Sequence, residues 1–562
     1  METTREIASP PSSDVCNIAA HLPRMAARVP DQSAVIIPSG RQADGQTVYT
    51  HLTFRALEEL SNRYANGLVA GGIQRGMRTL LMVRPGKEFI GLVFAMFKVG
   101  AVPVMIDPGM GVKRLLECVR GVAPQALVGI PPAQLMRVIR RGAFGSVRHV
   151  VTVGRRWCWG GPTLTQLAQR ASPTFTPAAT QSHETAAILF TSGSTGPAKG
   201  VVYEHGMFEA QVRAIRDQYG IEPGEIDLPT FPLFALFNPA LGMASVIPEM
   251  DASHPAQVDP KRIVDAIRQH GVTNTFGSPA LWDRVSCYCE EHGIRLPSLG
   301  RILIAGAPVS GTVIVRIRKM LNDDADVHTP YGATEALPVA SISGHELVGD
   351  CIEPSRRGAG ICVGRPLAGL DVCIIRITDD PIETWTDDLV VPDGERGEIV
   401  VRGDIVTKSY YGLPKADRLA KIPDGDKLWH RMGDVGYYDD AGRLWFCGRK
   451  AHRVTTADET MFTIPCEAVF NQHPEVARSA LVGVGSPGGQ RAVIIIEPGT
   501  GRLPTGSIAR RLSEQLLELG RANPLTSCIA DVLFHRSFPV DVRHNAKIDR
   551  ESLALWAAEQ LG

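Results

Sequence analysis

Short apolar runs alternate with helical repeats through most of the chain. Apolar residues recur at helical spacing from Phe54 to Leu68, after an N-cap residue type at Thr53, and Gly71 with Gly72 ends the pattern. A second helix is predicted over 87–98, and buried strands are predicted over 79–83, 101–106, 186–190 and 301–305. Strands that alternate with helices in this way predict a layered α/β architecture with largely parallel sheets.

The pattern changes beyond residue 397. A strand is predicted over 398–402, and the stretch 437–446 predicts two strands around a turn. After Gly448 the pattern predicts a smaller α+β unit, with strands over 480–484 and 491–497 and helices over 507–519 and 550–560. We therefore place the main domain boundary near 448–450.

Composition and charge exclude several classes of protein. The chain has 562 residues, with 59 Lys plus Arg and 59 Asp plus Glu, so its net charge is zero and no general basic surface for nucleic acid is expected. The longest apolar stretch, 92–106, is interrupted by Lys98, Gly100 and Pro103, which excludes a membrane span. The start of the chain lacks the apolar core of a signal peptide, and its 11 cysteines form no Cys-x-x-Cys pair. A cytoplasmic protein with reduced thiols is expected.

A loop rich in glycine and hydroxyl residues directly follows the predicted strand 186–190. Glycine allows backbone N–H groups to approach phosphate oxygens, hydroxyls donate further hydrogen bonds, and lysine adds positive charge. An ordinary surface loop has a similar composition, and the spacing is not that of a Walker A loop. The candidate phosphate ligands are Thr191, Ser192, Gly193, Ser194, Thr195, Gly196 and Lys199.

Five motifs stand in a fixed order along the chain. They are the loop 190–200, Tyr331-Gly332-Ala333-Thr334-Glu335, Trp429-His430-Arg431-Met432-Gly433-Asp434, Gly448-Arg449, and Lys547 within Asn545-Ala546-Lys547-Ile548. In this order they resemble the acyl-adenylate-forming superfamily, from about Leu52 to the C-terminus. The resemblance implies layered α/β subdomains plus a β-barrel-like region in a large N-terminal domain, 1–449. It also implies a small, mobile α+β C-terminal domain, 450–562, that acts as a lid.

The resemblance also implies the role of each motif residue. Tyr331 would stack on adenine, Asp434 and Arg449 would bind the ribose, and Thr334 and Glu335 would serve a phosphate and its Mg²⁺. Lys547 would neutralise charge that builds as a carboxylate attacks the α-phosphate of ATP. Taken singly, each residue also has an ordinary structural explanation. Tyr331 is explained as a core aromatic, Asp434 as a turn residue and Glu335 as a carboxylate at a helix start, while Arg449 and Lys547 are explained as exposed cations. The nucleotide-binding set implied by the resemblance is completed by Gly306, Ala307 and Gly332.

Two segments depart from the usual superfamily pattern. The run 450–482 contains no glycine, although most members carry a glycine-bearing loop that lines the pantetheine channel. With a Cβ at every position, this loop leaves little room for the pantetheine arm that carries the thiol of CoA. The sequence therefore argues against transfer of the acyl group to CoA but not against adenylation. This run, the string 541–547 and the segment 231–239 are similar to those of the β-lactone synthetases of bacterial long-chain olefin biosynthesis.

That branch implies a specific reaction. ATP would activate a long-chain 2-alkyl-3-hydroxyalkanoic acid as an acyl-AMP, and the 3-hydroxyl would displace AMP to close a β-lactone. His205, Glu204 and His452 are candidates by type for the group that takes the hydroxyl proton. The segment 231–239, with Leu241 and Met243, is either an alkyl tunnel or plain core. A fatty acyl-CoA ligase and an inactive nucleotide-binding scaffold are the alternatives, and the branch also implies assembly with other olefin-pathway enzymes.

Overall fold

The computed structural model describes residues 15–43, 45–190, 198–540 and 547–562. A six-stranded sheet has the order β6-β5-β3-β4-β7-β8. Its strands all run parallel to their neighbours except β7 and β8, which are antiparallel. They are β3 (Arg78–Met82), β4 (Val102–Ile106), β5 (Ala126–Gly129), β6 (His149–Thr152), β7 (Thr185–Phe190) and β8 (Gly200–Glu204).

A larger sheet of 14 strands runs in the order β16-β17-β19-β20-β15-β14-β13-β12-β11-β9-β10-β1-β2, with β18 paired to β19. From β1 to β13 it is parallel, apart from the β1–β2 hairpin. These strands are β1 (Ser33–Arg41), β2 (Thr47–Thr53), β9 (Ile226–Pro229), β10 (Ala244–Val246), β11 (Asn274–Gly277), β12 (Arg301–Ile304) and β13 (Asp326–Ala333).

The rest of the larger sheet is antiparallel and forms the β-barrel-like region. Its strands are β14 (Ala336–Ser343), β15 (Ile361–Pro366), β16 (Asp371–Ile375), β17 (Gly397–Arg402), β18 (Lys421–Asp424), β19 (Lys427–Tyr438) and β20 (Leu444–Arg449). The change from parallel to antiparallel pairing therefore occurs at β13 and β14, where the Tyr-Gly-x-Thr-Glu motif lies.

Helices connect the parallel strands. The Thr53 hydroxyl caps α2 by accepting a hydrogen bond from the Ala56 amide, and α3 is almost wholly buried between α2 and the sheet. The helices before the small unit are α1 (His21–Arg28), α2 (Phe54–Ala70), α3 (Lys87–Val99), α4 (Val112–Val122), α5 (Pro131–Ile139), α6 (Leu164–Gln169), α7 (His205–Tyr219), α8 (Asn238–Leu241), α9 (Pro260–His270), α10 (Pro279–Glu291), α11 (Gly311–Met320), α12 (Gly344–Glu346), α13 (Ile352–Arg356) and α14 (Pro414–Ala420). No helix in the described ranges is long and apolar enough to cross a membrane.

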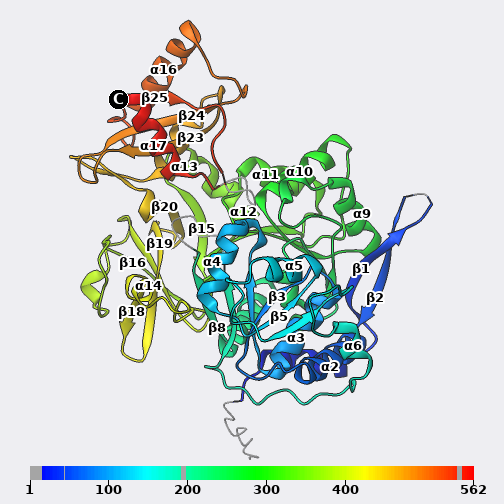
Figure 1. Ribbon diagram of the computed structural model, residues 1–562. Coiled ribbons are helices and arrows are strands. Elements are labelled where there is room, and N and C mark those ends of the chain that lie inside the picture. Colours follow the sequence, from blue (N-terminus) through cyan, green and yellow to red (C-terminus); the bar gives the residue numbers. More distant parts are fainter. Residues whose placement is uncertain (1–14, 44, 191–197, 541–546) are drawn as a thin grey trace, which may run out of the picture.

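Beyond β20 a small α+β unit gathers at one end of the molecule (Figure 1). Its three-stranded sheet has the order β23-β24-β25, and its two apolar clusters draw all their residues from position 454 onward. The elements are β21 (Val454–Thr455), β22 (Thr460–Met461), α15 (Thr463–Phe470), β23 (Val476–Val484), β24 (Arg491–Pro498), α16 (Gly506–Arg521), β25 (Asp531–Phe534) and α17 (Arg550–Leu561). The α/β fold class predicted from the pattern is confirmed, and a boundary at 449/450 stays a prediction.

Candidate active site

One cavity of about 700 Å³ collects the predicted site residues that the structure describes. It lies where the larger sheet changes from parallel to antiparallel and where the small C-terminal unit approaches. Six predicted phosphate ligands, Thr191 to Gly196, lie outside the described residues. The predicted residues in the cavity wall are Lys199, Gly306, Ala307, Tyr331, Gly332, Thr334, Glu335, Asp434, Arg449 and Lys547.

Strand ends and one hairpin position these side chains. Gly306 follows the carboxyl end of β12 with φ +96°, a conformation that favours glycine. Thr334 and Glu335 form the connection between β13 and β14. Asp434 and Arg449 are opposite one another in the β19–β20 ladder. Ligands of open α/β sheets bind at such carboxyl ends, so the wall is built where a ligand is expected.

A buried acid joins the predicted adenine-stacking and ribose-binding residues. The Tyr331 hydroxyl donates to Oδ2 of Asp434 at 2.6 Å, and Arg449 Nη1 lies 3.0 Å from Oδ1. No aligned hydrogen bond accompanies that ion pair, and Arg449 Nη1 donates to the Met432 carbonyl at 3.1 Å. Oδ1 of Asp434 therefore has no hydrogen-bond partner among the described residues. A buried acceptor left open on the cavity wall fits a ribose hydroxyl.

The electrostatics of this trio follow from burial. Burial raises the pKa of the Asp434 carboxyl, and the charge of Arg449 opposes the rise. The pKa of Arg449 is raised, chiefly by Asp434, so the guanidinium stays charged. The pKa of Tyr331 is raised well above its ordinary value, first by burial and then by Asp434, so its hydroxyl stays a donor.

Glu335 is held by residues from the barrel-like region. Tyr410 donates to its Oε1 at 2.7 Å, and the backbone and hydroxyl of Thr407 donate to its carbonyl at 2.9 and 3.1 Å. Glu335 itself lines the cavity. The described residues contain no group of three or more His, Cys, Asp or Glu that could hold a metal. A single carboxylate of this kind fits Mg²⁺, which commonly takes one or two carboxylates and completes its shell with phosphate oxygens and water.

An aromatic wall closes the other end of the cavity. Phe234 stacks on Phe276 with ring centroids 3.5 Å apart, and Phe237 lies 6.3 Å from Phe208. The predicted tunnel segment 231–239 contributes Phe231, Leu233, Phe234, Leu236 and Phe237 to the wall, and the adjacent Ala240 also lines it. Leu241 and Met243 instead are buried in the core. The sequence leaves open whether this segment is tunnel or core, and the structure shows both: part of it lines the cavity and part of it is core.

The three candidate bases differ in whether they reach the cavity. His205 is 2% exposed, accepts a hydrogen bond from the Ile18 amide at 3.3 Å, and has a pKa lowered to about 4 by burial. Glu204 accepts from Lys408 at 2.8 Å. Of the three, only His452 lines the cavity, and burial, Arg550 and Arg449 lower its pKa to about 4.

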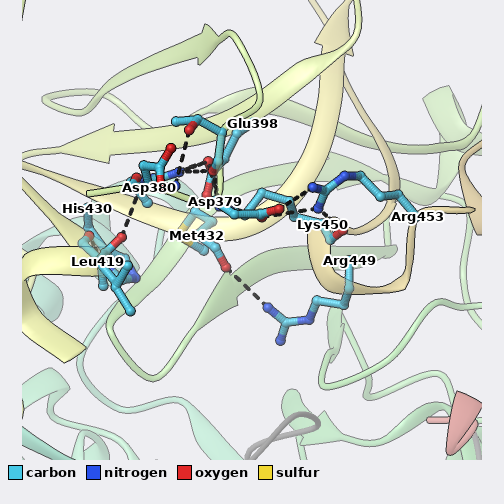
Figure 2. A network of polar contacts seen from close by, with 12 residues as sticks. Asp379, Asp380, Glu398, Leu419, His430, Met432, Arg449, Lys450 and Arg453 are labelled. Atoms are coloured by element: carbon cyan, nitrogen blue, oxygen red, sulfur yellow. Dashed lines mark hydrogen bonds and ion pairs between the residues drawn. The ribbon is translucent and has the colours of Figure 1, made fainter. Parts of the chain in front are cut away.

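A buried ionic network anchors the segment that follows Arg449 (Figure 2). Arg431 donates to Oε2 of Glu398 through Nη2 at 2.6 Å and Nε at 3.1 Å, and Lys450 Nζ reaches the same oxygen at 3.0 Å. Arg453 pairs with Asp379 nearby. The network ties residues on both sides of Ala451 to the barrel-like region, whereas Arg449 points toward Met432 (Figure 2).

Several residues of the site carry no recognisable sequence signal. Tyr410 and Thr407 reach Glu335 from more than 70 positions away, and Gln211 contacts Leu337 from 126 positions away. Lys421 donates to the Thr407 carbonyl, and burial lowers its pKa to about 7. The helical pattern of 205–219 places Gln211 on a helix but does not say what that helix faces.

The amino-acid sequence is similar to that of known proteins. The sequence matches the AMP-binding enzyme family over residues 22–411. The chain belongs to the AMP-binding enzyme family. Within it, the chain is 48% identical to an olefin beta-lactone synthetase of Xanthomonas campestris pv. campestris, over 97% of this chain and 98% of the relative. It is also 48% identical to an olefin beta-lactone synthetase of Stenotrophomonas maltophilia, over 97% of this chain and 99% of the relative.

The fold of this AMP-binding enzyme is also similar to solved structures. A crystal structure of ATP-bound MatB from Rhodopseudomonas palustris has a TM-score of 0.76 at 22% identity, and the match covers 97% of this chain and 100% of MatB. The likeness spans both the large region and the small C-terminal unit. Both regions of this chain therefore share the fold of that structure.

Proposed function

We propose that this AMP-binding enzyme converts a long-chain 2-alkyl-3-hydroxyalkanoic acid into a β-lactone through an acyl-AMP. The observation that carries the proposal is the 48% identity, over 97% of the chain, to two olefin beta-lactone synthetases. A single cavity with a polar, charged end and an aromatic end supports it, because an acyl-AMP has both kinds of surface.

The reaction has two balanced steps. A carboxylate oxygen of the acid attacks the α-phosphorus of ATP, and pyrophosphate leaves. The 3-hydroxyl oxygen then attacks the acyl carbon, AMP leaves with the bonding pair, and the hydroxyl proton is released. The second step is intramolecular, so a cavity that folds the acid toward its own carbonyl raises the effective concentration of the nucleophile.

The site residues take distinct parts in this proposal. Tyr331 contacts adenine, and Asp434 and Arg449 hold the ribose, with the open Oδ1 of Asp434 as an acceptor. Lys547, a wall residue from the far end of the chain, stabilises negative charge at the α-phosphate. Glu335 would hold a Mg²⁺ ion, which neutralises phosphate charge when bound.

The loop candidates and the small unit complete the proposal. Thr191 to Gly196, with Lys199, Gly306, Ala307, Gly332 and Thr334, would bind the phosphates and the base. We assign residues 450–562 as a lid that brings Lys547 to the cavity, which agrees with the separate apolar clusters of that unit. A cytoplasmic location and assembly with other olefin-pathway enzymes stay predictions.

One mass-spectrometric comparison tests the reaction. The purified enzyme is incubated with a 2-alkyl-3-hydroxy acid, ATP and Mg²⁺, with and without CoA. We expect a product lighter than the acid by one water in both samples, together with AMP and pyrophosphate. A thioester that forms only with CoA would instead identify an acyl-CoA ligase, and no nucleotide turnover would identify an inactive scaffold.

A further inference from the structure

Besides Oδ1 of Asp434, a second buried oxygen in the cavity wall has no hydrogen-bond partner among the described residues. Gln211 lies on α7, is 2% exposed and lines the cavity. Its Oε1 has no hydrogen-bond partner in the part of the chain that the structure describes. Buried side-chain oxygens are nearly always hydrogen-bonded in folded proteins. An orphaned acceptor on a cavity wall therefore points to a donor that arrives with a ligand.

The orientation of this amide is decided by its other end. Nε2 of Gln211 donates to the Leu337 carbonyl at 2.8 Å. A flipped amide would set Oε1 against that carbonyl oxygen, and two acceptors repel one another. The nearby hydroxyl of Tyr203 is occupied, because it donates to the Thr334 carbonyl. Oε1 is thus the acceptor that remains open.

Gln211 lies between the proposed adenylation centre and the apolar part of the cavity wall. Leu337 and Thr334 flank Glu335 at the β13–β14 connection, where adenylation is proposed. The other residues of α7 in the wall, Phe208, Val212 and Ile215, are apolar. In a bound acid, C1 must lie at the adenylation centre and the alkyl chains among apolar residues. C3 is two bonds from C1, so its hydroxyl falls at this junction.

We propose that Gln211 is a specificity-determining residue that accepts a hydrogen bond from the 3-hydroxyl of the acid. The inference rests on the proposed function, because that function supplies the 3-hydroxyl. An acid without this hydroxyl would leave Oε1 desolvated and unpaired, so the site selects against it. The hydrogen bond also holds the hydroxyl oxygen beside the activated carbonyl.

Adenylation rates for three acids with the same alkyl chains test the assignment. They are the 3-hydroxy acid, the 3-deoxy acid and the 3-methoxy acid, each measured by pyrophosphate release. In the wild type we expect kcat/KM for the hydroxy acid to exceed that for the deoxy acid by about 10-fold to 100-fold. The methoxy acid has no O–H to donate, so it should behave like the deoxy acid.

Two variants separate the hydrogen bond from general packing. Gln211→Met keeps an unbranched side chain of similar length without the acceptor, so the preference should shrink to within about three-fold. Ile215→Val trims an apolar residue one turn further along α7. This control should change both acids by the same factor and leave their ratio intact.

Two results would overturn the assignment. One is a wild type that uses the methoxy acid as well as the hydroxy acid, and the other is a Gln211→Met variant with its preference intact. The methoxy comparison needs only the wild type, so it can overturn the assignment even if the variant does not fold. Lactone formation is measured separately by mass. If the preference collapses in Gln211→Met while the wild type makes no lactone, the proposed function fails and the assignment of Gln211 stands.

Discussion

The Glu398 carboxylate should stabilise the protein more than any exposed ion pair of the barrel-like region. Glu398 and Arg431 are 1% and 2% exposed, and Arg431 and Lys450 converge on one oxygen, Oε2. In Glu398→Leu the side-chain volume is similar but the negative charge is lost. Arg431 then stays buried with only backbone carbonyls as partners, those of Thr378, Asp380 and Leu419.

Removing one partner of a buried pair costs about 3–5 kcal/mol, because the other charge is left uncompensated. With an unfolding entropy of ~2.1 cal/mol/K per residue, the 562 residues give ~1.2 kcal/mol/K. The expected fall in Tm is therefore about 3–4 °C. Glu398→Gln keeps one acceptor oxygen and should fall between this variant and the wild type.

Thermal unfolding followed by intrinsic fluorescence measures this change. Asp388→Ala is the matched control, since Asp388 pairs with Arg376 at 3.0 Å but both side chains are more than half exposed. Such a pair contributes at most about 1 kcal/mol, so its Tm should change by less than ~1 °C. A Glu398→Leu Tm within 1 °C of the wild type, like that of the control, would refute the reasoning about burial.

Three further predictions concern the site and its surroundings. Lys547→Ala should lower the adenylation rate by about 10²–10³, measured by pyrophosphate exchange, and an unchanged rate would remove its role. Glu335→Gln should raise the Mg²⁺ concentration needed for half-maximal rate by about ten-fold or more, whereas an unshifted Mg²⁺ titration would exclude Glu335 as a ligand. Burial raises the pKa of Asp227 to about 7 although Asn238 and Asn274 each donate to it at 2.7 Å. Because Asp227 binds its proton more tightly in the folded than in the unfolded chain, its contribution to stability is full below about pH 4 and is lost as the pH rises to about 7. Asn does not titrate, so the stability of Asp227→Asn relative to the wild type should increase between about pH 4 and pH 7. Curves of Tm against pH that run parallel for the two proteins would contradict this.

Local patterns predicted the elements well because they depend on near neighbours. The pattern from Phe54 to Leu68 predicted α2, which runs from Phe54 to Ala70, and the strand predicted over 398–402 is β17, Gly397–Arg402. Strand edges differ by a residue, as at β3, which begins at Arg78 and ends at Met82. The spacing of apolar residues shows which face of a strand is buried. It does not show where the hydrogen bonds to the neighbouring strand end, and these decide the first and last residue of a strand.

The reaction type also came from the sequence. Five motifs in a fixed order predicted adenylation, and the glycine-free run 450–482 predicted a departure from thioester formation. In the structure that run begins as a short turn and the β21–β22 hairpin. The predicted site residues within these motifs line one cavity wherever the structure describes them.

Only the tertiary structure decided which other side chains serve that cavity. Three candidate bases were equivalent by residue type, and the fold places His452 in the wall while it buries His205 against Ile18. Nothing in the sequence distinguishes Gln211 from other glutamines. In the fold its Nε2 donates to the carbonyl of Leu337, 126 positions away, and its Oε1 is left without a hydrogen-bond partner among the described residues. The physical reason is the same throughout. Periodicity and motifs depend on neighbours in the chain, whereas desolvation, charge pairing and an unsatisfied acceptor depend on neighbours in space.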